Sequence, residues 1–166
     1  MMPLVHVSVG AAVALDAAAW ASWSFVVGLV GARLTASAVA HDTWLTRTRR
    51  FERDARCYES AGIRRWKDSL PEFGAFAGGR SKRHLPGRDP HSLAAFAGEA
   101  RRAEYVHWAI IAALPAFAIW NPAPLFAAMA AYAVAANVPC IAIQRYNRVR
   151  IGRIDRRTTA RHKAQA

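Results

Sequence analysis

The chain has 166 residues, which favours one domain, and 54% of them are apolar. Its formal net charge of +12 would suit a nucleic-acid-binding protein, but the aromatic residues lie inside the apolar runs and not among the arginines. Apolar and basic residues occupy separate stretches, which is poor for a soluble core. We therefore predict an all-α integral membrane protein with about three spans, a single membrane domain over residues 1–166.

The first apolar run, residues 4–32, exceeds the ~20 residues that cross a bilayer. It has no basic n-region and Asp16 interrupts it, so we expect an uncleaved membrane anchor. Asp16 is either an intramembrane polar group that faces a partner or an interfacial residue of a span shifted to 17–38. Arg33 marks the cytoplasmic end of this span, which puts the N-terminus outside.

Residues 46–104 form a predicted basic loop on the cytoplasmic side of the membrane. Within residues 46–70, apolar side chains recur at helical spacing, first Phe51, Ala55 and Tyr58, then Ile63, Trp66 and Leu70. Such basic amphipathic helices suit either the lipid headgroup layer or the protein's own membrane helices. Both alternatives are open from the sequence.

A possible catalytic pair lies in the same loop, in the stretch His84-Leu-Pro-Gly-Arg-Asp89. Its H-x4-D spacing has the form seen in glycerolipid acyltransferases, where the His is a base toward a hydroxyl and the Asp orients it. The spacing also arises by chance in single sequences. Asp89 or Ser92 could instead cap the helix that follows.

Two further spans are predicted at residues 105–120 and 125–143. Asn121-Pro-Ala-Pro124 forms a tight turn between them, because two prolines cannot continue a helix. Pro139 is expected to break the third span near its inner end, and a basic tail over residues 144–166 follows. This helical hairpin keeps both basic blocks on the cytoplasmic side of the cell membrane.

Four short motifs resemble the glycosyl-4,4'-diaponeurosporenoate acyltransferase family. They are Arg102-Ala-Glu104 with His107-Trp108, Ala136-Asn-Val-Pro139, Gln144-Arg-Tyr-Asn-Arg148 and Trp66-Lys-Asp-Ser-Leu-Pro71. The resemblance covers roughly residues 45–152. It implies a small membrane enzyme of bacterial carotenoid biosynthesis that transfers a fatty acyl group to a sugar hydroxyl of a glycosylated C30 carotenoid acid. The Ala- and Arg-rich composition leaves another glycolipid or isoprenoid glycoside open as the acceptor.

Acyl transfer to an alcohol needs a base for the hydroxyl proton, donors for the oxyanion and a bound acyl donor. His107 is the candidate base, and Glu104, one helical turn earlier on the same face, is expected to orient its ring. The predicted binding residues are hydrogen-bonding or cationic side chains close to the membrane: Asn137, Gln144, Asn147, Arg101, Arg102, Arg145 and Arg148. The arginines would hold an anionic acyl donor such as acyl-CoA.

Several predictions concern what the chain does not use or leaves open. Cys57 and Cys140 lie in segments of different character and lack neighbouring ligands, so we expect neither a disulfide nor a metal site. Glu104 and His107 could simply hold the helix through ion pairs with Arg145 or Arg148. A non-enzymatic membrane scaffold or accessory subunit of a lipid or carotenoid pathway is therefore the alternative function.

Overall fold

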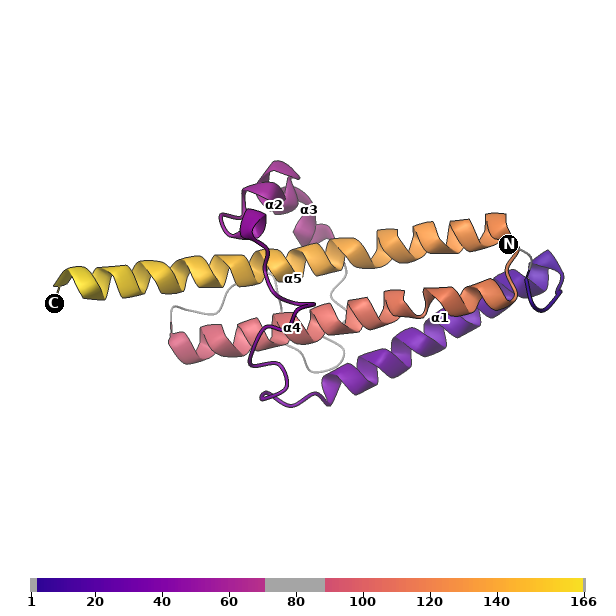
Figure 1. Ribbon diagram of the computed structural model, residues 1–166, viewed down its shortest axis with the longest axis horizontal. Helices are drawn as coiled ribbons and strands as arrows, with labels where there is room; N and C mark the ends of the chain where they lie inside the picture. Colours follow the sequence, from indigo (N-terminus) through magenta and orange to yellow (C-terminus); the bar gives the residue numbers. More distant parts are fainter. Residues whose placement is uncertain (1–2, 71–88, 166) are drawn as a thin grey trace. The chain divides into compact units, whose positions relative to one another are not determined.

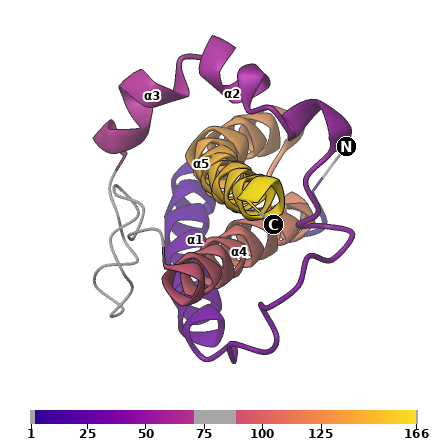
Figure 2. The same ribbon diagram turned by 90° about the vertical axis from the view of Figure 1, so that its left-hand side faces the viewer.

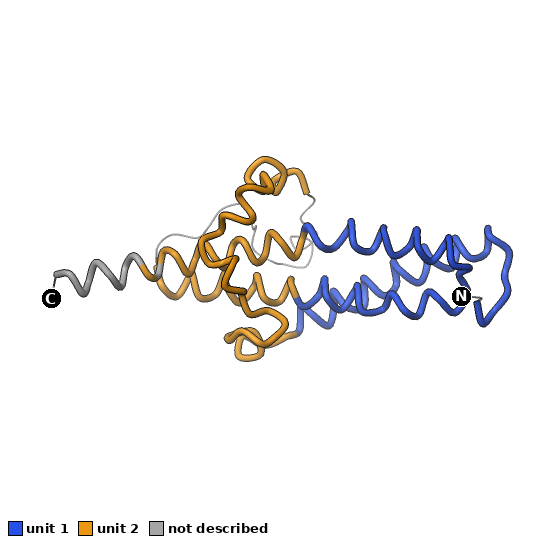
Figure 3. Tube along the Cα trace, turned by 45° about the horizontal axis from the view of Figure 1, so that its top comes forward, with its two compact units in different colours: residues 1–33, 105–139 blue, residues 34–104, 140–166 orange. Residues whose placement is uncertain are grey.

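A computed structural model describes residues 3–70 and 89–165, with side chains except those of residues 155 and 157–165, as helices joined by turns and irregular segments (Figure 1). These residues include no strand, which confirms the predicted all-α class. They form two compact units (Figure 3). Unit 1 comprises Met1–Arg33 and Tyr105–Pro139, and unit 2 comprises Leu34–Glu104 and Cys140–Ala166. The single membrane domain over residues 1–166 stays a prediction.

Helix α1 (Val9–Ala32) belongs to unit 1. Ser8 caps it, since its hydroxyl accepts a hydrogen bond from the backbone N–H of Ala11 at 3.3 Å. The helix contains Asp16, so its bounds agree better with the predicted span 4–32 than with the shifted one. Large apolar side chains cover it on all sides and many are exposed, Phe25 by 67% for example. A helix of this kind suits a lipid environment.

The predicted second span, residues 105–120, is not one regular helix. Helix α4 (Pro90–Ala112) ends inside it, and the 3-10 helix η4 (Leu114–Ile119) follows. Pro115 explains the change, because it has no backbone N–H and its ring would clash with the carbonyl four residues earlier. The α-helical part of this predicted span therefore reaches only Ala112.

Helix α5 (Ala123–Gln165) follows the short turn at Asn121, with Pro124 in its first turn, where a missing N–H costs nothing. The helix continues through Pro139, so the predicted break near the inner end of the third span is wrong. Proline is tolerated there at the cost of one backbone hydrogen bond, the one that the carbonyl of Ala135 would accept. The predicted span 125–143 and the start of the predicted tail form one helix.

Two stretches of the described residues are long and apolar enough to cross a membrane. They are α1, with a mean hydropathy of 1.6, and Ala123–Ile154 of α5, with a mean hydropathy of 1.8. Only 11% and 22% of their most apolar windows are buried, so most of this apolar surface has no protein cover. This agrees with a membrane protein, while the number of spans and the topology stay predictions.

Short helical turns pack on α5 in unit 2, as Figures 1 and 2 show. They are η1 (Arg50–Glu52), α2 (Arg56–Ser60), α3 (Ile63–Trp66) and η2 (Lys67–Ser69). The chain reverses between them at Ala55 and Gly62, both with a positive φ. The expectation of two amphipathic helices over residues 46–70 is therefore corrected to four short turns.

The apolar side chains of these turns cover α5 and are not turned outward. Ala55 and Ile63 are completely buried against Ile143, Tyr146 and Val149 of α5, and three partly buried side chains join them: Tyr58, Trp66 and Leu70. The structure thus favours packing against the protein's own helix over the headgroup layer for these residues. Phe51, by contrast, is 69% exposed, so it does not share the buried face of Ala55 as predicted.

Candidate functional site

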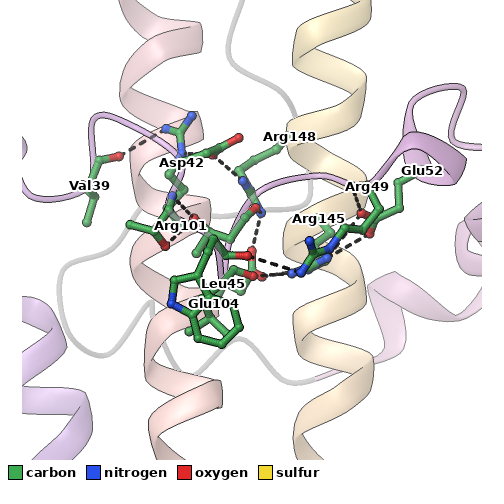
Figure 4. A network of polar contacts seen from close by, with 12 residues as sticks. Val39, Asp42, Leu45, Arg49, Glu52, Arg101, Glu104, Arg145 and Arg148 are labelled. Carbon is green, nitrogen blue, oxygen red and sulfur yellow. Dashed lines mark hydrogen bonds and ion pairs between the residues drawn. The ribbon is translucent and has the colours of Figure 1, made fainter.

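Glu104 of α4 is the centre of a buried ion-pair network in unit 2 (Figure 4). Its carboxylate is fully buried, with Oε1 accepting from Nε of Arg145 at 2.7 Å and Oε2 accepting from Nη2 of Arg148. Both arginines project from α5, three residues apart and hence on one face. One carboxylate therefore joins α4 to α5 through two charge-assisted hydrogen bonds.

The two arginines also hold the chain segment that precedes η1. Nη2 of Arg145 donates to the carbonyl of Leu45 at 2.6 Å, and Nη2 of Arg148 donates to the carbonyl of Thr46 at 2.6 Å. Nη1 of Arg148 lies 2.7 Å from Oδ1 of Asp42. Each guanidinium thus satisfies backbone carbonyls and carboxylates together, a geometry that its planar set of donors permits.

A second buried carboxylate, Glu52, extends the network to α2. Nη1 of Arg145 lies 3.2 Å and 3.3 Å from its two oxygens, and the Tyr58 hydroxyl and the backbone N–H of Arg49 also donate to it. Burial alone would raise the pKa of Glu52, but these hydrogen bonds and the Arg145 charge outweigh it, so the pKa lies below its usual value. The pKa of Tyr58 is raised by burial and by its bond to Glu52.

The remaining predicted arginines have structural partners as well. Arg101 pairs with Asp42 and donates from Nη1 to the carbonyl of Val39 at 3.2 Å. Arg102 pairs with Glu99 and donates from Nη2 to the carbonyl of Leu34 at 2.7 Å. The contacts of Arg145 and Arg148 with Glu104 are those of the bracing alternative, and Arg101 and Arg102 also pair within the protein. The part of the four arginines in binding an acyl donor stays a prediction.

His107 and Asn137 form a hydrogen-bonded pair in unit 1. Nδ1 of the half-buried imidazole lies 2.9 Å from Oδ1 of Asn137, whose Nδ2 in turn donates to the carbonyl of Ala133 at 2.9 Å. Because that second bond fixes the amide with its oxygen toward the ring, Nδ1 is the nitrogen that carries the proton. The neutral imidazole then has its basic lone pair on Nε2.

The predicted partnership of Glu104 and His107 involves two different units, since unit 2 includes Glu104 and unit 1 includes His107. Glu104 accepts hydrogen bonds from Arg145 and Arg148, and Nδ1 of His107 bonds to Asn137. Orientation of the ring by Glu104 stays a prediction. Asn137, which we expected to bind substrate, holds the position of a ring-orienting residue.

Gln144 and Asn147 of α5 are 4% and 2% exposed. Oε1 of Gln144 and Nδ2 of Asn147 are buried without a hydrogen-bond partner. Unpaired buried polar atoms cost free energy and often mark a site that a ligand completes. Both residues therefore stay candidates for binding substrate.

The alternative catalytic pair is only partly described, since His84 lies outside the described residues. Oδ2 of Asp89 accepts a hydrogen bond from the backbone N–H of Ser92 at 2.8 Å, which confirms the expected helix cap at the start of α4. The same backbone N–H lowers the pKa of Asp89. This carboxylate is exposed to solvent.

Asp16 is buried in unit 1, where the sequence allowed two interpretations. Its Oδ1 accepts hydrogen bonds from Nε1 of Trp120 at 2.9 Å and from Nδ2 of Asn121 at 2.7 Å. The carboxylate is 7% exposed and ties α1 to the turn that precedes α5. Its partners are thus intramolecular, and a polar group in an apolar helix is satisfied without an outside partner.

Sequence reasoning missed the roles of Asp42, Glu52 and Tyr58 in the network of unit 2. Asp42 follows His41 after the first predicted span, and Glu52 shares an arginine-rich stretch with Asp54. A carboxylate within such a basic stretch is a signal that could have pointed to Glu52, since such a group has nearby cations to pair with. Tyr58 carried no such signal.

Comparison with known proteins adds one match. No curated protein and no solved structure matches the chain. A family model described as glycosyl-4,4'-diaponeurosporenoate acyltransferase matches residues 41–157, which contain the ion-pair network and the His107–Asn137 pair but not α1. Because the match covers more than half of the sequence, the chain belongs to the glycosyl-4,4'-diaponeurosporenoate acyltransferase family.

Proposed function

We propose that this protein is a membrane acyltransferase that esterifies a sugar hydroxyl of a glycosylated carotenoid or related glycolipid with a fatty acyl group. The family match carries the proposal. The apolar α1 and the apolar part of α5 support a membrane location, where acceptor and fatty chain both reside. The acyl donor is expected to be a thioester such as acyl-CoA.

His107 is the proposed general base. Nε2 accepts the proton of the acceptor hydroxyl as its oxygen attacks the acyl carbonyl carbon, so a new C–O bond forms. The thioester C–S bond then breaks, and the imidazolium returns the proton to the departing thiolate. An imidazole can both accept and donate a proton, which suits both transfers, and such catalysis contributes about 10²–10⁴-fold.

Asn137 supports this role through its hydrogen bond to Nδ1. An acceptor at Nδ1 keeps the proton on that nitrogen and the lone pair on Nε2, which is the logic of histidine bases held by a third group. Asn137 does not touch the reacting atoms in this proposal and is a positioning residue. Gln144 and Asn147 are the proposed ligands of substrate hydroxyls, with Oε1 of Gln144 as a hydrogen-bond acceptor and Nδ2 of Asn147 as a donor.

The test is the H107A variant, assayed in membranes that contain a glycosylated lipid acceptor and an acyl-CoA, with the acylated product measured by mass spectrometry. We expect the product to disappear while expression and membrane insertion remain normal. The matched control is H41A, because His41 is exposed. Normal product from H107A would reject His107 as the base.

A scaffold or accessory subunit is the second candidate, favoured by the bracing contacts of Glu104 with Arg145 and Arg148. Such a protein would form no ester when purified alone with acceptor and donor. It would instead raise the activity of a partner enzyme in membranes. Ester formation by the purified chain, lost in H107A, excludes this alternative.

A further inference from the structure

Unit 2 contains a cavity of about 350 Å³. The segment that precedes η1, the first turns of α4 and the stretch 148–156 of α5 line it. Ligand pockets in proteins range over roughly 300–1,000 Å³, so this one has room for a small charged group and not for a whole lipid. The predicted binding residues Arg101 and Arg148 belong to its wall.

The wall of the cavity is strongly cationic. Four arginines line it (Arg53, Arg101, Arg148 and Arg156) against one carboxylate, Asp42, which Arg101 and Arg148 already share. Arg148 is 6% exposed, and its Nε is buried without an acceptor. Excess positive charge beside an unsatisfied buried donor indicates that an anion belongs here.

Part of the cavity lining is apolar. Leu93, Ala94 and Ala97 of α4 contribute to it together with Val149 and Ile151 of α5. Leu93 and Ile151 also belong to a small buried hydrophobic cluster. A ligand that matches the whole lining combines an anionic group with an adjoining apolar part.

We propose that this cavity binds the phosphate group of an amphipathic molecule. Guanidinium groups match phosphate oxygens in charge and in fork geometry, and the apolar wall accommodates the carbon chain next to the phosphate. Two sources present this chemistry: the pyrophosphate of an acyl-CoA donor and the phosphate of a phospholipid headgroup. The first source rests on the proposed function, whereas the phosphate site itself does not.

The arginines of the wall divide into two kinds. Arg101 and Arg148 belong to the ion-pair network, so their loss would disturb folding. Arg53 and Arg156 are exposed and lie outside that network, and Nη2 of Arg156 donates a 3.5 Å hydrogen bond to the carbonyl of Arg53. The double variant R53Q/R156Q therefore removes two positive charges from the cavity and leaves the network intact.

The experiment measures ligand binding by the full-length protein in neutral detergent micelles. One arm titrates CoA and 4'-phosphopantetheine against pantetheine, which differs from 4'-phosphopantetheine by the phosphate alone. The other arm titrates short-chain phosphatidic acid against the matching diacylglycerol. We expect at least one phosphate ligand to bind, its phosphate-free counterpart not to bind, and the arm that binds to identify the source.

The double variant then tests the cavity itself. A hydrogen bond to a charged group is worth about 1.5–3 kcal/mol, so R53Q/R156Q should weaken phosphate binding at least roughly tenfold. The matched control is R47Q/R50Q, which removes the same charge from exposed positions of the same segment that do not line the cavity. Equal weakening in both variants, or no binding of either phosphate ligand, overturns the proposal.

Failure of the phosphate site and failure of the proposed function give different results. If the purified protein binds CoA through Arg53 and Arg156 but forms no ester, the phosphate site stands and the acyltransferase proposal does not. If it forms ester and R53Q/R156Q leaves both the KM for acyl-CoA and phosphatidic acid binding unchanged, the phosphate site is rejected and the acyltransferase remains.

Discussion

Arg145 on α5 and Glu104 on α4 form a buried pair, with Nε of the arginine 2.7 Å from Oε1 of the carboxylate. They are 41 residues apart in the chain, and Glu104 is fully buried while the Arg145 side chain is 13% exposed. A buried pair of this kind is a weak source of net stability, because both charges lose their water. Removal of Glu104 is costly, however, because two arginines then lose a buried counterion at once and keep only Glu52 and Asp42 as acidic partners.

The E104Q variant tests this argument, since it leaves Arg145 and Arg148 without their shared counterion. Breaking a buried ion pair from one side costs about 3–5 kcal/mol, so we expect a large fall in the Tm of the protein in detergent. The control is E99Q, which removes a partly exposed partner of Arg102 and should cost no more than about 1 kcal/mol. A fall in Tm for E104Q that is no larger than the fall for E99Q would contradict the structural role of Glu104.

Glu52 is expected to make the stability of the folded protein depend on pH in the acidic range. Its pKa is lowered in the folded state, so the stability that it adds is fully present above its unfolded value near 4.5 and is lost as the pH falls through the lower folded value. Acid unfolding monitored by circular dichroism should therefore include a component below about pH 4.5 that is absent in E52Q. In Y58F, which loses one hydrogen bond to the carboxylate, this component should move to higher pH.

The position of Asn137 predicts two different outcomes for two substitutions. N137A removes the acceptor at Nδ1 of His107, and we expect acyl transfer to fall by up to about 100-fold because the base loses its orientation. N137D restores an acceptor and adds a negative charge that favours the imidazolium. Activity should partly return, with the pH–rate profile for kcat/KM shifted to higher pH. Equal losses in both variants, with unchanged profiles, would indicate a structural role only.

Local signals in the sequence predicted the features that depend on near neighbours. Alternating apolar and polar stretches gave the helical class, and Asp89 was expected to cap a helix because an acidic residue before a periodic run satisfies its free N–H groups. Short motifs spread over the chain indicated the family that the comparison shows. Such signals need no knowledge of which helices meet.

Features that depend on partners far away in the chain could not be predicted from such local signals. The role of Glu52 follows from Arg145, which is 93 residues away, and Asp16 finds its donors at Trp120 and Asn121, more than 100 residues away. Pro139 was expected to break α5, but a long helix can continue past a proline at the loss of one backbone hydrogen bond. Tertiary contacts decided each case, and spacing within a segment does not reveal them.

The contact between α1 and α4 in unit 1 gives a last prediction. A methyl group added at Gly31 would lie 2.3 Å from Cγ2 of Val106, closer than side-chain atoms can approach. Because Val is branched at Cβ and has few rotamers in a helix, it cannot move aside at low cost. G31A should therefore lower stability by about 1–3 kcal/mol despite the better helix propensity of Ala.

G28A is the matched control, since no atom lies within 4 Å of a methyl group at Gly28, and it should leave the Tm unchanged or raise it slightly. Thermal unfolding of both variants in the same detergent makes the comparison, and equal Tm values would show that the two helices do not pack closely at Gly31.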